Sequence, residues 1–152
     1  MLKKIISVFA VVFALGAYVL PQAASAASKA DNHVVFQINS NDKGLMNLVL
    51  NNAENVKSEY SKMGKSIEIE VVAYGPGLAM LTAKSPVAAR IQNISANGDD
   101  ITFAACNNTM KKMEKKSGKP VQLLEFSNVK VVPAGVVRIM ELQNMGWNYI
   151  KP

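Results

Sequence analysis

Short apolar runs typical of strands alternate along this chain with longer segments of helical periodicity. The first run, HVVFQI, covers residues 33–38 and is rich in β-branched and aromatic side chains. In the segment that follows it, apolar side chains recur every three or four residues: Leu45, Val49, Ala53, Val56 and Tyr60. That spacing is typical of an amphipathic helix, and Gly64 marks its expected end.

The same alternation continues to the C-terminus. The other predicted strands are residues 66–74, 101–105, an extended stretch at 121–132 interrupted at Ser127-Asn128, and 147–150. The other predicted helical segments are a short turn at 78–83, then 85–98 (with Ser85 as its cap and Pro86 at its first position), 107–116 and 136–145. Strands that alternate with helices form right-handed βαβ units, which produce a parallel sheet with helices on both faces. The sequence therefore predicts an α/β fold: a three-layer α/β/α sandwich with a mostly parallel sheet of about five strands.

The chain begins with a segment typical of a secretory signal peptide. Lys3 and Lys4 precede an uncharged apolar stretch at residues 5–20, and the small residues Ala24-Ser25-Ala26 follow it. A basic start, an apolar centre and a small-residue exit are the three parts of a cleavable signal. The apolar stretch is shorter than the roughly 20 residues that span a bilayer. We therefore expect cleavage after Ala26, with no stable membrane anchor afterwards.

This interpretation divides the chain into a signal peptide at residues 1–26 and one α/β domain at 27–152, located in the periplasm. The whole chain carries 17 basic and 11 acidic residues, a net charge of +6. After the leader, its only dense basic blocks are Lys111-Lys112 and Lys115-Lys116. Nucleic-acid binding needs a focused basic stripe, so we expect no nucleic acid as a partner.

A single cysteine, Cys106, stands between a predicted strand and a predicted helix. Proteins of oxidising compartments favour paired cysteines, and one cysteine forms no internal disulfide. The start of a helix stabilises an anion, which lowers the pKa of a thiol in that position. Cysteine is also a common buried residue in cores. The sequence leaves both readings of Cys106 open, a reactive thiolate and a structural thiol.

The carboxyl ends of parallel strands meet at one edge of a sheet, where α/β proteins bind ligands. Four loops are expected at that edge: residues 39–42, 74–77, 106–109 and 133–135. Within them the candidate binding residues, which offer hydrogen bonds or let backbone approach a ligand, are Asn107, Asn108, Thr109, Gly75, Gly77 and Gly135. The only histidine, His33, is expected at the opposite end of its strand.

Metal binding and conventional hydrolysis have little support in the sequence. Zinc would need four suitable ligands, which are not present. Sulfur ligands suit Cu(I), and Cys106, Met110 and Met113 have the spacing of one helical face, although methionines at this spacing are more commonly core residues. A nucleophile elbow is missing, and Gly75-Pro76-Gly77 lacks the Gly-Lys-Ser/Thr ending of a phosphate-binding loop. We predict neither a metal site nor a cofactor.

Five ordered motifs cover nearly all of the chain after the leader: HVVFQI (33–38), LNNAEN (50–55), VVAYGPGL (71–78), ITFAACNNTM (101–110) and VVPAGVVRIMELQNMGWNYIKP (131–152). Together they resemble the DsrE/DsrF-like superfamily, in its exported, signal-peptide-bearing branch. The resemblance implies a parallel sheet between helices and assembly into trimers or hexamers. It also implies that a cysteine placed like Cys106 carries sulfur as a persulfide. The chain departs from the cytoplasmic relay proteins in its leader and in the sequence CNNTM after the strand.

Three functional hypotheses follow. The first is a thiol-based sulfur carrier or sulfurtransferase-like protein in which Cys106 accepts sulfur from a sulfane-sulfur donor. The second is a non-catalytic module that binds a small ligand or a protein. The third is Cu(I) binding. Whether the chain is an enzyme stays open at this level.

Overall fold

In the computed structural model, residue 30 and residues 32–152 are described; the predicted signal peptide lies outside them. All five strands are parallel and form one sheet in the order β4-β3-β2-β1-β5. The strands are β1 (Asn32–Ile38), β2 (Ile67–Ala73), β3 (Ile101–Cys106), β4 (Val129–Val132) and β5 (Asn148–Ile150). The helices are α1 (Lys43–Lys62), the 3₁₀ helix η1 (Gly75–Leu81), α2 (Ala88–Ala96), α3 (Asn107–Ser117) and α4 (Gly135–Asn144). The prediction of a parallel α/β fold is confirmed.

Helix α1 follows directly from its sequence. The Asp42 carboxylate accepts a hydrogen bond from the Leu45 N–H at 2.7 Å, which caps the first turn. Its apolar stripe is buried against the sheet: Met46, Val49, Leu50 and Ala53. The helix ends at Lys62, and Gly64 then adopts a positive φ of 66°, which favours glycine.

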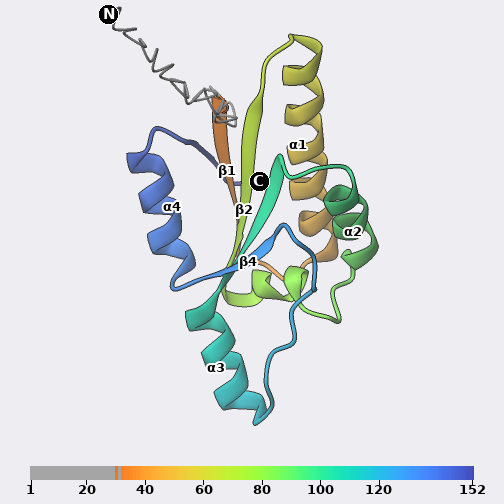
Figure 1. The fold of residues 1–152 in the computed structure, drawn as a ribbon. Coiled ribbons are helices and arrows are strands. Elements are labelled where there is room, and N and C mark those ends of the chain that lie inside the picture. Colours follow the sequence, from red (N-terminus) through yellow and green to blue (C-terminus); the bar gives the residue numbers. More distant parts are fainter. Residues whose placement is uncertain (1–29, 31) are drawn as a thin grey trace, which may run out of the picture.

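Helices cover both faces of the sheet, but unequally. Helices α1 and α2 lie on one face and α4 on the other, as Figure 1 shows. The larger core cluster joins η1, α1 and α2 to the sheet, with Phe36 and Phe103 among its largest side chains. The cluster under α4 is smaller: Val35, Val72, Ala104, Val132, Ile139 and Leu142. Helix α3 extends beyond the end of the sheet (Figure 1) and contributes no buried residue.

The prediction of an extended stretch over residues 121–132 is only partly correct. Within it, only Val129–Val132 forms a strand of the sheet. The residues before the turn at Ser127-Asn128 run beside η1, where Leu124 N–H donates to the Leu81 carbonyl at 2.8 Å. Their apolar side chains pack against the larger core cluster, and their backbone forms an isolated antiparallel bridge between Leu123 and Thr82, outside the sheet.

The second predicted helix begins later than expected. Helix α2 starts at Ala88, and the Ser85 hydroxyl accepts a hydrogen bond from Val87 N–H at 3.2 Å in the turn before it. In the part of the chain that the structure covers, no helix has the length and apolar character needed to cross a membrane.

Candidate functional site

The loops that follow β1, β2, β3 and β4 meet at the carboxyl edge of the sheet, as predicted. The Gly75 N–H donates to the Thr109 hydroxyl at 2.9 Å, which joins the loop after β2 to α3. The Asn108 N–H donates to the Pro133 carbonyl at 3.2 Å, which joins α3 to the loop after β4. These contacts connect segments more than 20 residues apart in the chain and hold the start of α3 in place.

Two of the predicted glycines allow close approach between these loops. A Cβ on Gly77 would lie 2.3 Å from the Ile38 carbonyl oxygen, so no larger residue fits without a shift of backbone. A Cβ on Gly135 would lie 3.0 Å from the Cβ of Tyr74. Gly77 therefore seats η1 against the end of β1, and Gly135 seats the start of α4 against the end of β2.

Cys106 is the last residue of β3 and the N-cap of α3. Side chains alternate along a strand, so Cys106 shares with Ala104 the face that α4 covers, whereas Phe103 and Ala105 face α1 and α2. Cys106 is buried, with 5% of its surface exposed. It therefore lies at the point where the first turns of α3 and α4 approach each other.

The surroundings of this sulfur favour the thiolate. Burial raises the pKa of the Cys106 thiol. Hydrogen bonds from the Thr109 hydroxyl and from the N–H groups of Gly135, Thr109 and Asn108 lower it by more, so the net pKa lies below its ordinary value. The Thr109 oxygen already accepts from Gly75 N–H, which leaves its hydrogen for the sulfur. Groups at the starts of α3 and α4 thus favour a negative charge on this sulfur.

The predicted binding residues divide into three groups in the structure. The Thr109 hydroxyl and the N–H groups of Gly135, Thr109 and Asn108 lower the pKa of the Cys106 thiol and so favour its thiolate form. Gly75 acts one step away, through Thr109. The amide side chains of Asn107 and Asn108 make no hydrogen bond among residues 32–152, and Gly77 lies against β1 rather than the thiol. That Asn107 and Asn108 bind a ligand stays a prediction.

His33 lies at the amino end of β1, the end opposite Cys106. Its ring is 5.0 Å from the Trp147 ring, and its Nε2 is 3.7 Å from a Glu68 carboxylate oxygen. Met110 packs against the core cluster on the α1 face, away from the face that Cys106 occupies. No group of three or more His, Cys, Asp or Glu residues with metal-binding geometry occurs in the described residues.

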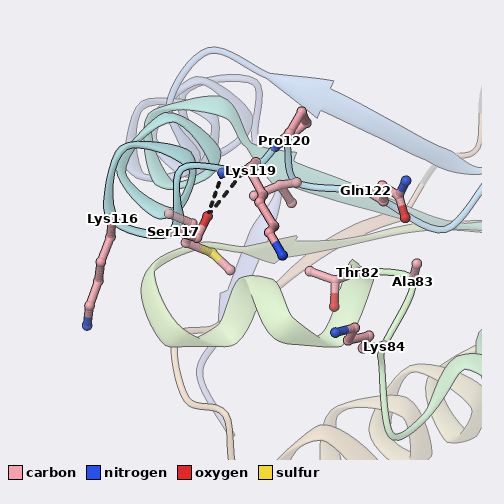
Figure 2. Close-up of a pocket in the computed structure, with 10 residues that line it drawn as sticks. Thr82, Ala83, Lys84, Lys116, Ser117, Lys119, Pro120 and Gln122 are labelled. Atoms are coloured by element: carbon pink, nitrogen blue, oxygen red, sulfur yellow. Dashed lines mark hydrogen bonds between the residues drawn. The ribbon is translucent and has the colours of Figure 1, made fainter.

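A groove of about 880 Å³ lies between α3 and the segment after η1, apart from the thiol (Figure 2). Its walls are residues 82–84 on one side, and the end of α3 with residues 119–122 on the other. Cys106 does not line it. Sequence patterns gave no sign of this groove, because it forms only where α3 and the returning chain stand clear of the sheet.

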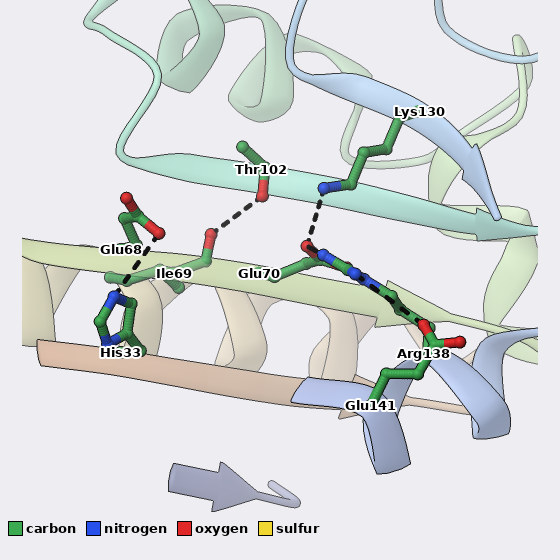
Figure 3. A network of polar contacts seen from close by, with 8 residues as sticks. All are labelled: His33, Glu68, Ile69, Glu70, Thr102, Lys130, Arg138 and Glu141. Atoms are coloured by element: carbon green, nitrogen blue, oxygen red, sulfur yellow. Dashed lines mark hydrogen bonds and ion pairs between the residues drawn. The ribbon is translucent and has the colours of Figure 1, made fainter. Parts of the chain in front are cut away.

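A buried ion network, also absent from the sequence predictions, fixes α4 on the sheet (Figure 3). Glu70 in β2 is 1% exposed. Its two carboxylate oxygens accept hydrogen bonds from Arg138 of α4, each at 2.8 Å, and Lys130 of β4 lies 2.8 Å from one of them. The sequence contained one indication of this network. Glu70 is a charged residue at an inward-facing position of a strand covered on both faces, and a buried charge requires a partner.

The network keeps Glu70 ionised. Burial raises the pKa of its carboxyl group, but the hydrogen bonds and charges of Arg138 and Lys130 lower it by more, so the net pKa is below the usual range. Arg138 lies in the first turn of α4, three residues after Gly135. The network therefore positions the same helix end whose Gly135 N–H group lowers the pKa of the Cys106 thiol.

Comparison with known proteins agrees with this architecture. A family model described as the DsrE/DsrF-like family matches residues 7–152. A solved structure, that of the protein of unknown function MTH1491 from Methanobacterium thermoautotrophicum, is 33% identical, with a TM-score of 0.68 over 80% of this chain and 100% of that one. No curated protein matches. The chain belongs to the DsrE/DsrF-like family.

Proposed function

We propose that this protein is a thiol-based sulfur carrier, or a sulfurtransferase-like protein, that holds sulfane sulfur as a persulfide on Cys106. The proposal rests on the position of Cys106 at the end of β3 and the start of α3, where the Thr109 hydroxyl and backbone N–H groups of α3 and α4 lower the pKa of its thiol. Membership of the DsrE/DsrF-like family supports it at the level of a fold related to sulfur relays.

The proposed step needs only the thiolate and a donor. With thiosulfate as the donor, the Cys106 thiolate attacks the outer sulfur, the S–S bond of thiosulfate breaks, and sulfite leaves with the electron pair. The product is a Cys106 persulfide anion, so no proton moves. A general base is unnecessary for a nucleophile that is already ionised, which agrees with the distance of His33 from this edge.

The pH dependence of Cys106 alkylation, followed by intact-protein mass spectrometry, tests the proposal. We expect an apparent pKa below the usual value of about 8.5, and a gain of one sulfur atom after incubation with thiosulfate or polysulfide. Thr109→Val should raise the apparent pKa, because the hydroxyl donor is lost, while Thr109→Ser should preserve it. Cys106→Ser is the control for loading. A thiol that reacts only after unfolding would refute the carrier role.

We further propose that the face of α4 is buried between copies of this chain, in a trimer or hexamer. Four apolar side chains of this region are more than half exposed: Val136, Val137, Met140 and Met145. Exposed apolar surface of this kind marks interfaces. Light scattering after size exclusion measures the assembly. Val137→Lys/Met140→Lys should give monomers, and an unchanged mass would exclude this face as the interface.

Export to the periplasm is proposed from the leader sequence. Intact mass of the protein recovered from a periplasmic fraction should correspond to a chain beginning at Ala27. A mass that retains residues 1–26 in the cytoplasmic fraction would refute this.

A further inference from the structure

The groove between α3 and the segment after η1 has the size of a ligand site. Its volume of about 880 Å³ falls within the range of pockets that bind drug-sized molecules. Four of its lining residues are apolar: Ala83, Met113, Pro120 and Val121. Three are basic, and none is acidic: Lys84, Lys116 and Lys119 supply its charges. A ligand that fits this lining has an apolar body and negative charge.

The lysines of the groove are available for a ligand. None of the three forms an ion pair with another residue of the described chain. Figure 2 shows the Lys119 side chain extending across the groove towards Thr82 and Lys84, while Lys116 points away from it. Glu114 is the acidic residue of α3 nearest in sequence to Lys116 and Lys119, and its carboxylate accepts a hydrogen bond from Val121 N–H at 3.0 Å. The positive charge that faces the groove thus comes from Lys84 and Lys119.

Several backbone groups on the two walls are already hydrogen-bonded within the protein. The Lys119 N–H donates to the Ser117 hydroxyl at 3.3 Å, and Pro120 has no N–H. The Ala83 N–H donates to the Gln122 carbonyl at 2.8 Å, across the groove floor. A peptide that binds by adding a strand needs free backbone groups along an edge. Recognition in this groove therefore depends on side chains, which favours an amphiphilic small molecule over an extended peptide.

We propose that this groove binds an anionic amphiphile, an aliphatic chain that ends in a carboxylate. Its head pairs with the ammonium groups of Lys84 and Lys119, and its tail lies on Met113, Pro120 and Val121. The methylene stems of the lysines add to the apolar wall while their charges stay at the water boundary. This site is separate from Cys106 and does not depend on the sulfur-carrier proposal.

Calorimetric titration with three ten-carbon probes below their micelle concentrations tests the site. The probes are decanoate, 1-decanol and decyltrimethylammonium, which share a tail and differ in the charge of the head. We expect decanoate to bind about tenfold more tightly than decanol, since two partly exposed ion pairs contribute about that factor, and the cationic probe to bind most weakly. Equal affinity for all three heads, or no binding, would overturn the proposal.

Matched variants locate the site. Lys84→Gln/Lys119→Gln should weaken the binding of decanoate about tenfold and leave the binding of decanol unchanged. Lys111→Gln/Lys112→Gln removes the same charge from α3 outside the groove and should change neither. Ala83→Phe, at an exposed position of the wall, should weaken both probes. An equal loss of decanoate affinity in the two double-lysine variants would mean that the probe is attracted by the overall charge and not by the groove. Tighter binding of an acidic peptide than of decanoate would assign the groove to a protein partner. Either result refutes the proposal.

Discussion

Removing Arg138 should destabilise the protein more than removing the charge of Glu70, although both belong to one ion pair. In Arg138→Met, the Glu70 carboxylate stays buried, since it is 1% exposed, with only Lys130 as a charged partner. Loss of one partner from a buried pair costs about 3–5 kcal/mol, and the remaining lysine places this case near 3. In Glu70→Gln, the Arg138 side chain is 23% exposed and reaches water, so we expect about 1.5 kcal/mol.

Urea unfolding at pH 7 measures both free energies. The double variant Glu70→Gln/Arg138→Met should cost less than the sum of the single variants by at least about 1 kcal/mol, because neither charge is then left alone. Glu141→Gln is the matched control. It removes the exposed carboxylate 4.0 Å from Arg138 and should cost less than about 0.5 kcal/mol.

The same pair predicts a pH dependence. The folded pKa of Glu70 is lowered, so the ionised carboxylate stabilises the fold above its unfolded pKa, and this contribution is lost as pH falls through the folded value. The stability advantage of the wild type over Glu70→Gln should therefore shrink below about pH 4. Glu70→Gln costing as much as Arg138→Met, or an advantage independent of pH, would refute this reasoning.

Three further substitutions test the structure at other points. Gly77→Ala should prevent stable folding, because its Cβ would lie 2.3 Å from the Ile38 carbonyl oxygen; soluble yield and circular dichroism measure this, and a normal melting curve would contradict it. Asp42→Ala should cost about 1 kcal/mol in urea unfolding through loss of the cap of α1, whereas Asp42→Asn should cost little. Gly135→Ala should move the start of α4 away from its neighbours and slow Cys106 alkylation at neutral pH; an unchanged rate would argue against a donor from α4.

Much of the fold was predictable because local patterns determine it. The alternation of strand and helix periods, together with the rule that crossovers are right-handed, placed the loops and Cys106 at one edge of the sheet. The extended stretch predicted at 121–126 stays outside the sheet, and the sequence does not reveal this, because apolar side chains that pack on a core look alike whether or not their backbone joins a sheet.

The groups that surround the Cys106 thiol were harder to predict from the sequence. The start of α3 beside Cys106 is a local feature, but the Gly135 donor comes from a helix that follows a different strand. The Glu70 pair joins residues 68 positions apart, and no periodicity reports such a partner. The asparagines looked functional by residue type, yet Asn108 acts through its backbone, which any residue other than proline supplies.

The strand order has a consequence for when this protein can fold. The last strand, β5, pairs with the first, β1, and the Tyr149 hydroxyl donates to Gln37, which lies 112 residues earlier. During synthesis β1 therefore has one side without a partner until the C-terminus emerges. Pairing over such a separation closes a long loop, which slows folding. If the protein is exported as we propose, and crosses the membrane unfolded, it gains from this order, because β5 completes the sheet after all the other strands.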